Sequence, residues 1–521
     1  MKRIGVGAAV LSMMAGFVGC STPSDESHES TAALGDGVEA AMAVGHAPSS
    51  VLVFLKGSAD LAPSEAFATK AERTASVHTR LVDHAKSAQK PLLEWLHRQG
   101  ADVKPFHIVN AVLVTDASPA LLQKLAARAD VARLMLDRPI RRELVQESES
   151  LVDRDGAEPG AIATVGPNIT ATGAPRVWSE LRANGTGVVI GSSDTGVSWT
   201  HPTLKTHYRG WNGTTADHSY SWHDAVHKGS STGNTCGYDT TAPCDDQGHG
   251  THTVGTMVGD DGAGNQIGMA PGAKWIGCRN MDANVGKPST YIECTEWFMA
   301  PYPQGQPDKA DPSKAADIIN NSWGCPASEG CQGSELQQVL KSVRAAGIVF
   351  VAAAGNSGSG CGSIVDQPAT ISAETLSVGA VDHRNGTIAS FSSRGPSKLD
   401  QRLGPDVSAP GVSVRSAYPG NGYSSMSGTS MASPHVVGEI ALVISAVPTL
   451  RGKVDELTKL VTSTATPKTS TQTCGGVSGS TIPNNTYGAG NIDAYKAVNT
   501  AKKTFESTTS TETASSEGVW Q

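Results

Sequence analysis

Three short segments of the sequence carry an acid, a base and a nucleophile. Asp194 follows the apolar run Gly187–Gly191, His249 lies between two glycines, and Ser430 sits among small residues where an apolar run begins. A serine hydroxyl attacks a carbonyl only when a base takes its proton, and a carboxylate can orient that base. Each residue alone has a plainer interpretation, since an Asp after a strand is usually a cap and a lone His is usually structural. Together they predict a catalytic triad.

The residues around these three positions resemble the subtilase family of serine peptidases. The matching motifs are Asp194–Val197, Gly248–Gly255 and Gly428–His435, in that order along the chain. The order Asp, His, Ser differs from that of chymotrypsin-like proteases and of α/β-hydrolases. The resemblance covers about residues 170–498. It implies a serine endopeptidase that works through an acyl-enzyme intermediate and needs no cofactor for its chemistry.

Within this family, two further segments look most like bacillopeptidase F-type members. These are Cys278–Met281 with the later Glu293 and Cys294, and Asn321–Pro326.

The resemblance also assigns an oxyanion hole. Asn356 ends the segment Ala352–Asn356, an apolar strand that opens into a glycine-rich loop. Its side-chain amide and the backbone N–H of Ser430, at the start of a helix, would stabilise the negative oxygen of the tetrahedral intermediate. The alternative is an ordinary asparagine in a turn.

Substrate binding is placed by the same comparison. The segment Asn321–Gly324 resembles the family strand that pairs with the peptide backbone, which predicts a broad endopeptidase. The S1 pocket would be lined by Ser322, Trp323, Gly324, Ala353, Ala354 and Gly355.

Asp366 would lie at the base of that pocket. It stands two residues before Pro368, as the corresponding residue of the family does, and a carboxylate there would favour Arg or Lys at P1. The alternative is that this loop, which also holds Cys361, is rearranged and that Asp366 lies in solvent or in a salt bridge.

The composition and the alternation of elements predict the fold. The chain has 521 residues, 57 glycines and 38% hydrophobic residues, which suits an α/β protein of two domains. Buried strands are expected at 187–191, 316–320 and 348–352, and Leu336, Val339, Leu340 and Val343 share one helical face. We therefore expect a subtilisin-like, mostly parallel sheet flanked by helices over residues 168–498.

A small α+β domain of ferredoxin-like type is expected at residues 49–142. Strands at 51–55, 106–114 and 131–136 alternate with helices at 65–98 and around Leu121–Leu125. By resemblance it is an inhibitory propeptide of the I9 type, cut between Arg138 and Val145, around Arg141 and Arg142, with a linker at 143–167. The alternative is a permanent peptide-binding domain.

The termini suggest export. Residues 1–20 read as a signal peptide, and the end of this segment at Cys20 resembles the lipobox of bacterial lipoproteins, although Phe17 is off that pattern and a plain secretory signal is the alternative. Residues 21–48 read as a flexible tether and 499–521 as a disordered tail. We expect a monomer that touches a membrane only through the lipid. The net charge of −8 without a basic run argues against nucleic-acid binding.

Eight of the nine cysteines remain once Cys20 is set aside, and an even set in an exported protein suggests disulfides. Cys236–Cys244 and Cys325–Cys331 are the expected short bridges, and the pairing of Cys278, Cys294, Cys361 and Cys474 is left open. Some could instead be free buried thiols. Structural Ca²⁺ could be held by Asp245, Asp246, Asp260, Asp261, Asp308 or Asp311, although short acidic runs are usually only solvated.

Two other classes of function compete with the peptidase. A lipase or esterase would carry its serine in a G-x-S-x-G turn and ahead of its acid and histidine, which this chain does not. A catalytically dead binding protein would usually lack a triad residue or the oxyanion asparagine, and all four are present.

Overall fold

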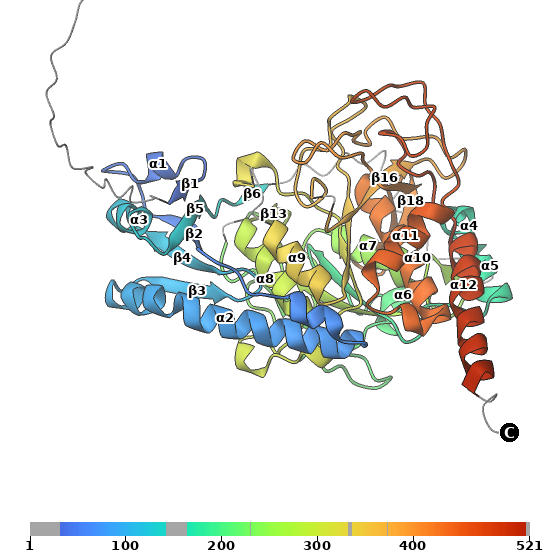
Figure 1. Ribbon diagram of the computed structural model, residues 1–521, viewed down its shortest axis with the longest axis horizontal. Coiled ribbons are helices and arrows are strands. Elements are labelled where there is room, and N and C mark those ends of the chain that lie inside the picture. The colour runs from blue at the N-terminus through green and yellow to red at the C-terminus, as the bar shows by residue number, and fades with distance from the viewer. Residues whose placement is uncertain (1–31, 142–163, 230, 332–335, 372, 517–521) are drawn as a thin grey trace, which may run out of the picture.

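The computed structural model describes residues 32–141, 164–229, 231–331, 336–371 and 373–516 (Figure 1). The signal peptide with Cys20, Arg142 and almost all of the expected linker lie outside the described residues. No helix within the described ranges is long and apolar enough to cross a membrane.

The larger sheet contains seven parallel strands in the order β17-β16-β15-β14-β8-β11-β9. Their bounds are β8 (Val189–Asp194), β9 (Trp222–Asp224), β11 (Lys274–Arg279), β14 (Ile318–Asn321), β15 (Val349–Ala353), β16 (Leu376–Val381) and β17 (Val407–Pro410). The strands expected at 187–191, 316–320 and 348–352 are therefore confirmed, each displaced by one to three residues.

Helices cover both faces of this sheet, which is why its strands are almost entirely buried. Ile318 and Val351 face the layer of α7 (His249–Val258) and α10 (Thr429–Ala446). Ile319 and Phe350 face the layer of α8 (Pro288–Met299) and α9 (Gln337–Ala345). The subtilisin-like α/β fold is confirmed.

Shorter elements surround these layers. They are α4 (Pro167–Ala171), α5 (Ala174–Glu180), α6 (Pro202–Lys205), α11 (Val454–Thr464), α12 (Ala494–Ser516), β7 (Thr164–Val165), β10 (Asn265–Gln266), β12 (Met281–Asp282), β13 (Val285–Gly286), β18 (Val414–Tyr418) and β19 (Gly422–Met426). Helix α12 continues well past residue 498, so the tail expected from 499 onward is wrong as far as Ser516. Its inner face is buried through Ala497, Val498 and Ala501.

The N-terminal domain has the β-α-β-β-α-β order of a ferredoxin-like fold. Its sheet runs β1-β5-β2-β4-β3, and its elements are β1 (Ala33–Leu34), α1 (Val38–Ala41), β2 (Ser49–Leu55), α2 (Lys70–Arg98), β3 (Asp102–Phe106), β4 (Ala111–Ala117), α3 (Pro119–Ala126) and β5 (Val131–Leu136). The single strand expected at 106–114 is wrong, because a turn at 107–110 divides it into β3 and β4. The tether is also wrong in part, since β1 pairs with β5.

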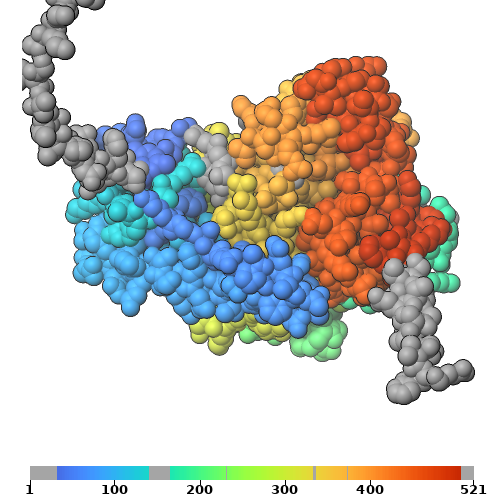
Figure 2. Space-filling model, viewed as in Figure 1, coloured from blue at the N-terminus to red at the C-terminus, as the bar shows by residue number. Residues whose placement is uncertain are grey.

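The sheet of this domain is buried on both faces. Val51, Val53 and Val112 pack under its own helices, whereas Leu52 and Leu113, on the opposite face, pack with residues of α8 and α9. In the space-filling view the blue N-terminal domain lies directly against the yellow surface around α9 (Figure 2). The two domains therefore share a hydrophobic interface.

Four disulfides are formed among the described residues. Cys236–Cys244 and Cys325–Cys331 are paired as expected, and the two bridges left open are Cys278–Cys294 and Cys361–Cys474.

Glu439 on α10 is a buried carboxyl group whose two oxygens accept no hydrogen bond from the described residues. Burial raises its pKa well above the usual range of a glutamate. The unfolded chain therefore releases this proton at a lower pH than the folded one, so stability should fall as pH rises above the ordinary glutamate pKa, by up to about 1.4 kcal/mol per pH unit.

We expect Glu439→Gln to lose this pH dependence, because its amide does not titrate. Thermal unfolding between pH 5 and 9 measures it, with the exposed Glu456→Gln as the matched control. Equal slopes for Glu439→Gln and the unmodified chain would contradict the expectation.

Candidate active site

The acid and the base of the predicted triad meet at the carboxyl end of β8, an interior strand of the larger sheet. Asp194 is the last residue of β8 and His249 is the first of α7. The Nδ1 atom of His249 lies 2.7 Å from Oδ1 of Asp194, and both side chains are buried. The same carboxylate oxygen accepts the N–H of Thr195 at 2.8 Å, which holds it in place. This geometry lets Asp194 fix the ring with Nδ1 as the donor.

The start of α7 is held against the end of β8 by a set of short contacts. Thr195 Oγ1 accepts the N–H of Gly250 at 3.0 Å and donates to Asp245 at 2.9 Å. Asp245 also accepts the N–H groups of Gly248 and Thr251, at 2.7 and 2.9 Å. A Cβ atom at position 250 would lie 2.1 Å from the carbonyl oxygen of Gly196, so only glycine permits this approach. Asp245 is therefore a positioning residue.

Ser430 is the second residue of α10, which packs against α7. Its hydroxyl donates to the carbonyl oxygen of Ser322 at 2.9 Å, and the hydroxyl of Ser322 donates to the carbonyl of Ser430 at the same distance. If Ser430 is the nucleophile, its hydroxyl would have to turn from this carbonyl toward His249 before attack.

Asn356 lies beside Ser430 with its amide oriented by its neighbour. Its Oδ1 atom accepts both the N–H and the hydroxyl of Thr429, each at 2.9 Å. The amide nitrogen is thereby directed away from Thr429. A Cβ atom at Gly428 would lie 3.6 Å from this nitrogen and 3.6 Å from the backbone nitrogen of Ser430. The two predicted oxyanion donors therefore flank one point.

His252, one turn along α7, does not compete with His249 as a base. Its Nε2 atom donates to the carbonyls of Val414 and Ser424, at 2.9 and 3.1 Å. Burial lowers the pKa of His252 to about 3, so this ring stays neutral.

The segments expected to line the S1 pocket come together at the ends of β14 and β15. Gly355 N–H donates to Thr429 Oγ1 at 3.2 Å, and Ala354 continues the sheet through a bond to Val378. Cys325 pairs with Gln367, which brings Asp366 beside Gly324, where a Cβ atom would lie 2.8 Å from Cβ of Asp366. Asp366 is half-buried at this place.

Trp323 differs from the other residues of this set. Its ring is buried, stacks on Tyr291 with 3.9 Å between centroids, and donates to the carbonyl of Ser193 at 3.1 Å. With its ring buried in this way, Trp323 would line the proposed pocket through its backbone.

A second candidate substrate strand is not predicted by the sequence. The two-residue strand β6 (Ile140–Arg141), at the end of the N-terminal domain, pairs antiparallel with β13, Arg141 opposite Val285 and Ile140 opposite Gly286. The N-terminal domain therefore ends in a strand that pairs with β13 of the catalytic domain. A two-residue strand carries no periodicity, so only the glycine at position 286 could have drawn attention to it.

Most of the aspartates considered as calcium ligands accept hydrogen bonds from nearby backbone groups or pair with an arginine. Asp245 holds the start of α7, Asp246 pairs with Arg279 at 3.1 Å, and Asp260, Asp261 and Asp311 accept nearby backbone N–H groups. The described part of the chain contains no group of three or more His, Cys, Asp or Glu residues suited to a metal ion.

Comparison with known proteins assigns the chain to a protein family. The model of the Subtilase family matches residues 185–490, more than half of the chain. The chain therefore belongs to the subtilase family of serine endopeptidases, whose chemistry uses no cofactor.

Three curated relatives illustrate the sequence identity and the coverage of these matches. Bacillopeptidase F of Bacillus subtilis (strain 168) is 36% identical over 452 residues, 82% of this chain but only 29% of the relative. Subtilisin DY of Bacillus licheniformis is 35% identical over 284 residues, 54% of this chain and 85% of the relative. Subtilisin Savinase of Lederbergia lenta is 36% identical over 200 residues, 38% of this chain and 64% of the relative. The similarity to a bacillopeptidase F is confirmed, although the chain spans less than a third of that protein.

Proposed function

We propose that this chain is a serine endopeptidase made as a zymogen, with Asp194, His249 and Ser430 as its catalytic triad. The observation that carries the proposal is the 2.7 Å contact between His249 Nδ1 and Asp194 Oδ1, beside the helix whose second residue is Ser430. His249 would take the proton of Ser430 during attack and return it to the leaving amine. The acyl-enzyme would then be hydrolysed by water activated by the same base.

A peptide-library cleavage profile of the processed enzyme tests this proposal. We expect internal bonds of the library peptides to be cut, with sequence preference concentrated at P1. Failure of the processed enzyme to cut any peptide would contradict the proposed activity.

Asn356 is proposed as the side-chain oxyanion donor. Asn356→Leu should lower kcat by about 10²–10³ with little change in KM, because the donor acts on charge that develops in the transition state; the magnitude is one established in this class of enzyme. Steady-state kinetics on a peptide amide measure it. Thr429→Val is the control, since it removes the hydroxyl that bonds Asn356 and leaves the amide donor in place. Equal losses for the two variants would show that Asn356 only supports the loop.

Asp366 is proposed to select basic residues at P1. Its place beside Gly324 and the S1 segments supports this. We expect peptides with P1 Arg or Lys to be cut faster than matched peptides with Leu or Phe, and Asp366→Asn to reduce kcat/KM for the basic peptides by about 10–100-fold through the lost charge-assisted contact. Equal rates of the unmodified enzyme on Arg, Leu and Phe would exclude the basic preference.

The N-terminal domain is proposed to be the inhibitory propeptide. Strand β6 occupies an edge of the catalytic domain that a peptide could otherwise use. Two further contacts hold the domain there: Asp137 accepts the N–H and the hydroxyl of Ser289, and Glu296 accepts the N–H groups of His107 and Ile108. Cleavage between Arg138 and Val145 would break the covalent link between the two domains, and N-terminal sequencing of the mature enzyme would locate the cut.

Export is proposed on the sequence of the first twenty residues, with Cys20 as the lipid-modified residue of a lipoprotein. The processed enzyme would be a monomer acting on peptides or proteins outside the cytoplasm.

A further inference from the structure

Helix α2 is divided between the two domains. Leu92 and Leu96, in its C-terminal half, belong to the core of the N-terminal domain. Val77 and Leu81, in its N-terminal half, belong to the core that contains α8 and α9 of the catalytic domain. Figure 1 shows the 29-residue helix running from the N-terminal sheet along the underside of the catalytic domain. A capping box between Thr69 and Glu72 begins the helix on that surface.

Lys70, the first residue of the helix, is inserted into the catalytic domain. Its Nζ atom donates to the carbonyls of Ala316 and Ala315, at 2.7 and 3.2 Å, and lies 3.3 Å from Oδ1 of Asp317. The side chains of Lys70 and Asp317 are only 8% and 5% exposed. A buried ammonium with three oxygen acceptors is a specific contact. Without it, the buried carboxylate of Asp317 would keep the N–H of Val189, at 3.0 Å, and the more distant guanidinium of Arg451, at 3.8 Å, and would lose its nearest charged partner.

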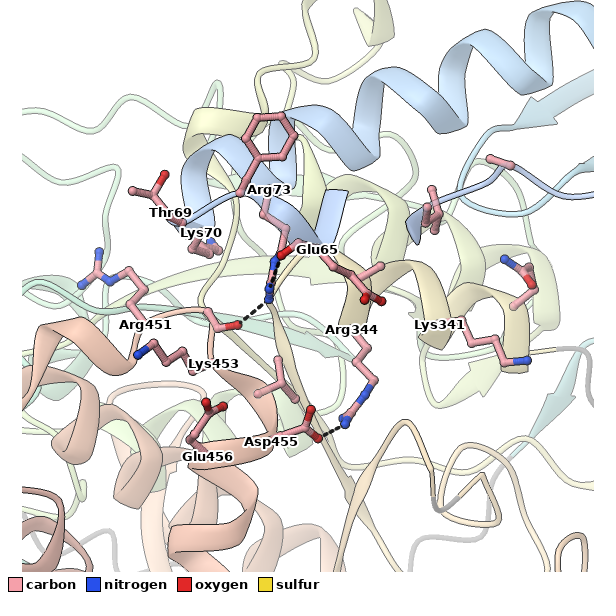
Figure 3. A pocket seen from close by; sticks show the side chains of 18 of the residues that line it. Glu65, Thr69, Lys70, Arg73, Lys341, Arg344, Arg451, Lys453, Asp455 and Glu456 are labelled. Carbon is pink, nitrogen blue, oxygen red and sulfur yellow. Dashed lines mark hydrogen bonds and ion pairs between the residues drawn. The ribbon is translucent and has the colours of Figure 1, made fainter. Parts of the chain in front are cut away.

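The backbone around this lysine is shaped for it. A Cβ atom at Gly452 would lie 2.7 Å from Cβ of Lys70, and Gly452 has a positive φ of 83°. Arg73 donates to the carbonyl of Gly452 at 3.0 Å, and Thr74 donates to the buried carbonyl of Ala346 at 2.8 Å. Figure 3 shows Lys70 and Arg73 at the mouth of the adjoining pocket, with Arg73 joined to both domains.

This anchor lies far from the active site along the sheet. Asp317 directly precedes β14, whereas Ser322, which bonds Ser430, directly follows it. The anchor and the reacting groups are thus at opposite ends of the same strand. Cleavage between residues 138 and 145 changes no residue of the anchor.

We propose that the Lys70 end of helix α2 is a second docking site that keeps the cleaved propeptide bound and the enzyme latent. This rests on the proposed zymogen function. While one contact is bound, the stiff helix α2 keeps the other at a high effective concentration near its binding site. The cleaved domain therefore dissociates slowly until α2 is released or digested.

The test uses the full chain and its own processing. The variant is Lys70→Met, which keeps an apolar stem, and the control is Lys90→Met, an exposed lysine on the same helix. Cleavage is followed by gel electrophoresis, retention of the cleaved domain by gel filtration, and latency by the lag before a peptide substrate is hydrolysed. Lys70→Met should be cleaved at the normal rate but should bind the cleaved domain about 10²-fold more weakly and lose most of the lag.

Thr74→Ala provides a second variant that inserts nothing new into the interface. It should shift retention and lag in the same direction by a smaller factor, and it decides the question if Lys70→Met does not fold. Retention and lag equal to those of Lys90→Met would overturn the docking site. Absence of any cleavage in the unmodified chain would instead contradict the zymogen proposal.

Discussion

Ser430→Ala is expected to lower kcat for peptide hydrolysis by about 10⁶, a magnitude established for nucleophile removal in this class of enzyme. In the proposed mechanism the variant loses the atom that forms the acyl-enzyme, while its backbone N–H keeps its proposed place as an oxyanion donor. The same change should leave the chain uncut near Arg142, because processing depends on the same hydroxyl. Initial rates on a peptide amide and the mass of the purified chain measure both effects.

The matched control is Ser445→Ala, a serine further along the same helix. It should retain normal rates and processing. Hydrolysis by Ser430→Ala at more than a small fraction of the normal rate would assign the nucleophile elsewhere.

Asp194→Asn should lower kcat by about 10⁴ with KM little changed. The amide oxygen can still accept the N–H of Thr195, so the end of β8 should keep its shape. An asparagine, however, can present its NH₂ group to His249 Nδ1. The imidazole would then carry its proton on Nε2, where it cannot accept the proton of Ser430.

The exposed Asp308→Asn serves as the control for removal of one carboxylate. Full kinetics and circular dichroism of both variants separate a tautomer effect from unfolding. A loss below tenfold for Asp194→Asn would contradict its place in the triad.

Each residue of the predicted triad has a local signal in the sequence. Asp194 ends a buried strand, His249 begins a helix after a glycine, and Ser430 is the second residue of a helix that follows a glycine. The structure brings Asp194 and His249 into contact and places Asn356 and Ser322 against the segment that carries Ser430.

The errors fall where tertiary contacts replace local signals. The turn at 107–110 contains Ile108 and Val109 and no glycine or proline, because the catalytic domain covers it and Glu296 accepts its N–H groups. This apolar turn therefore resembles a strand in the sequence. Helix α12 is Ser- and Thr-rich toward its C-terminal end, a composition typical of disorder, whereas its first turns pack on the core through Ala494, Ala497, Val498 and Ala501.

Other features depend on contacts between distant residues. Cys361 and Cys474 are 113 residues apart, so their pairing has no local signal. The pairing of β6 with β13 and the burial of Lys70 against Asp317 each join the N-terminal domain to the catalytic domain. Such contacts follow from how the two domains dock, which no local pattern encodes.

The most direct test of the central claim is labelling of the processed enzyme with a fluorophosphonate probe, which reacts with activated serine hydroxyls. We predict one label per molecule, located at Ser430 by peptide mass mapping, abolished by Ser430→Ala and strongly reduced by Asp194→Asn. Absence of labelling that depends on Ser430 in the processed enzyme would contradict the assignment of this chain as an active serine peptidase.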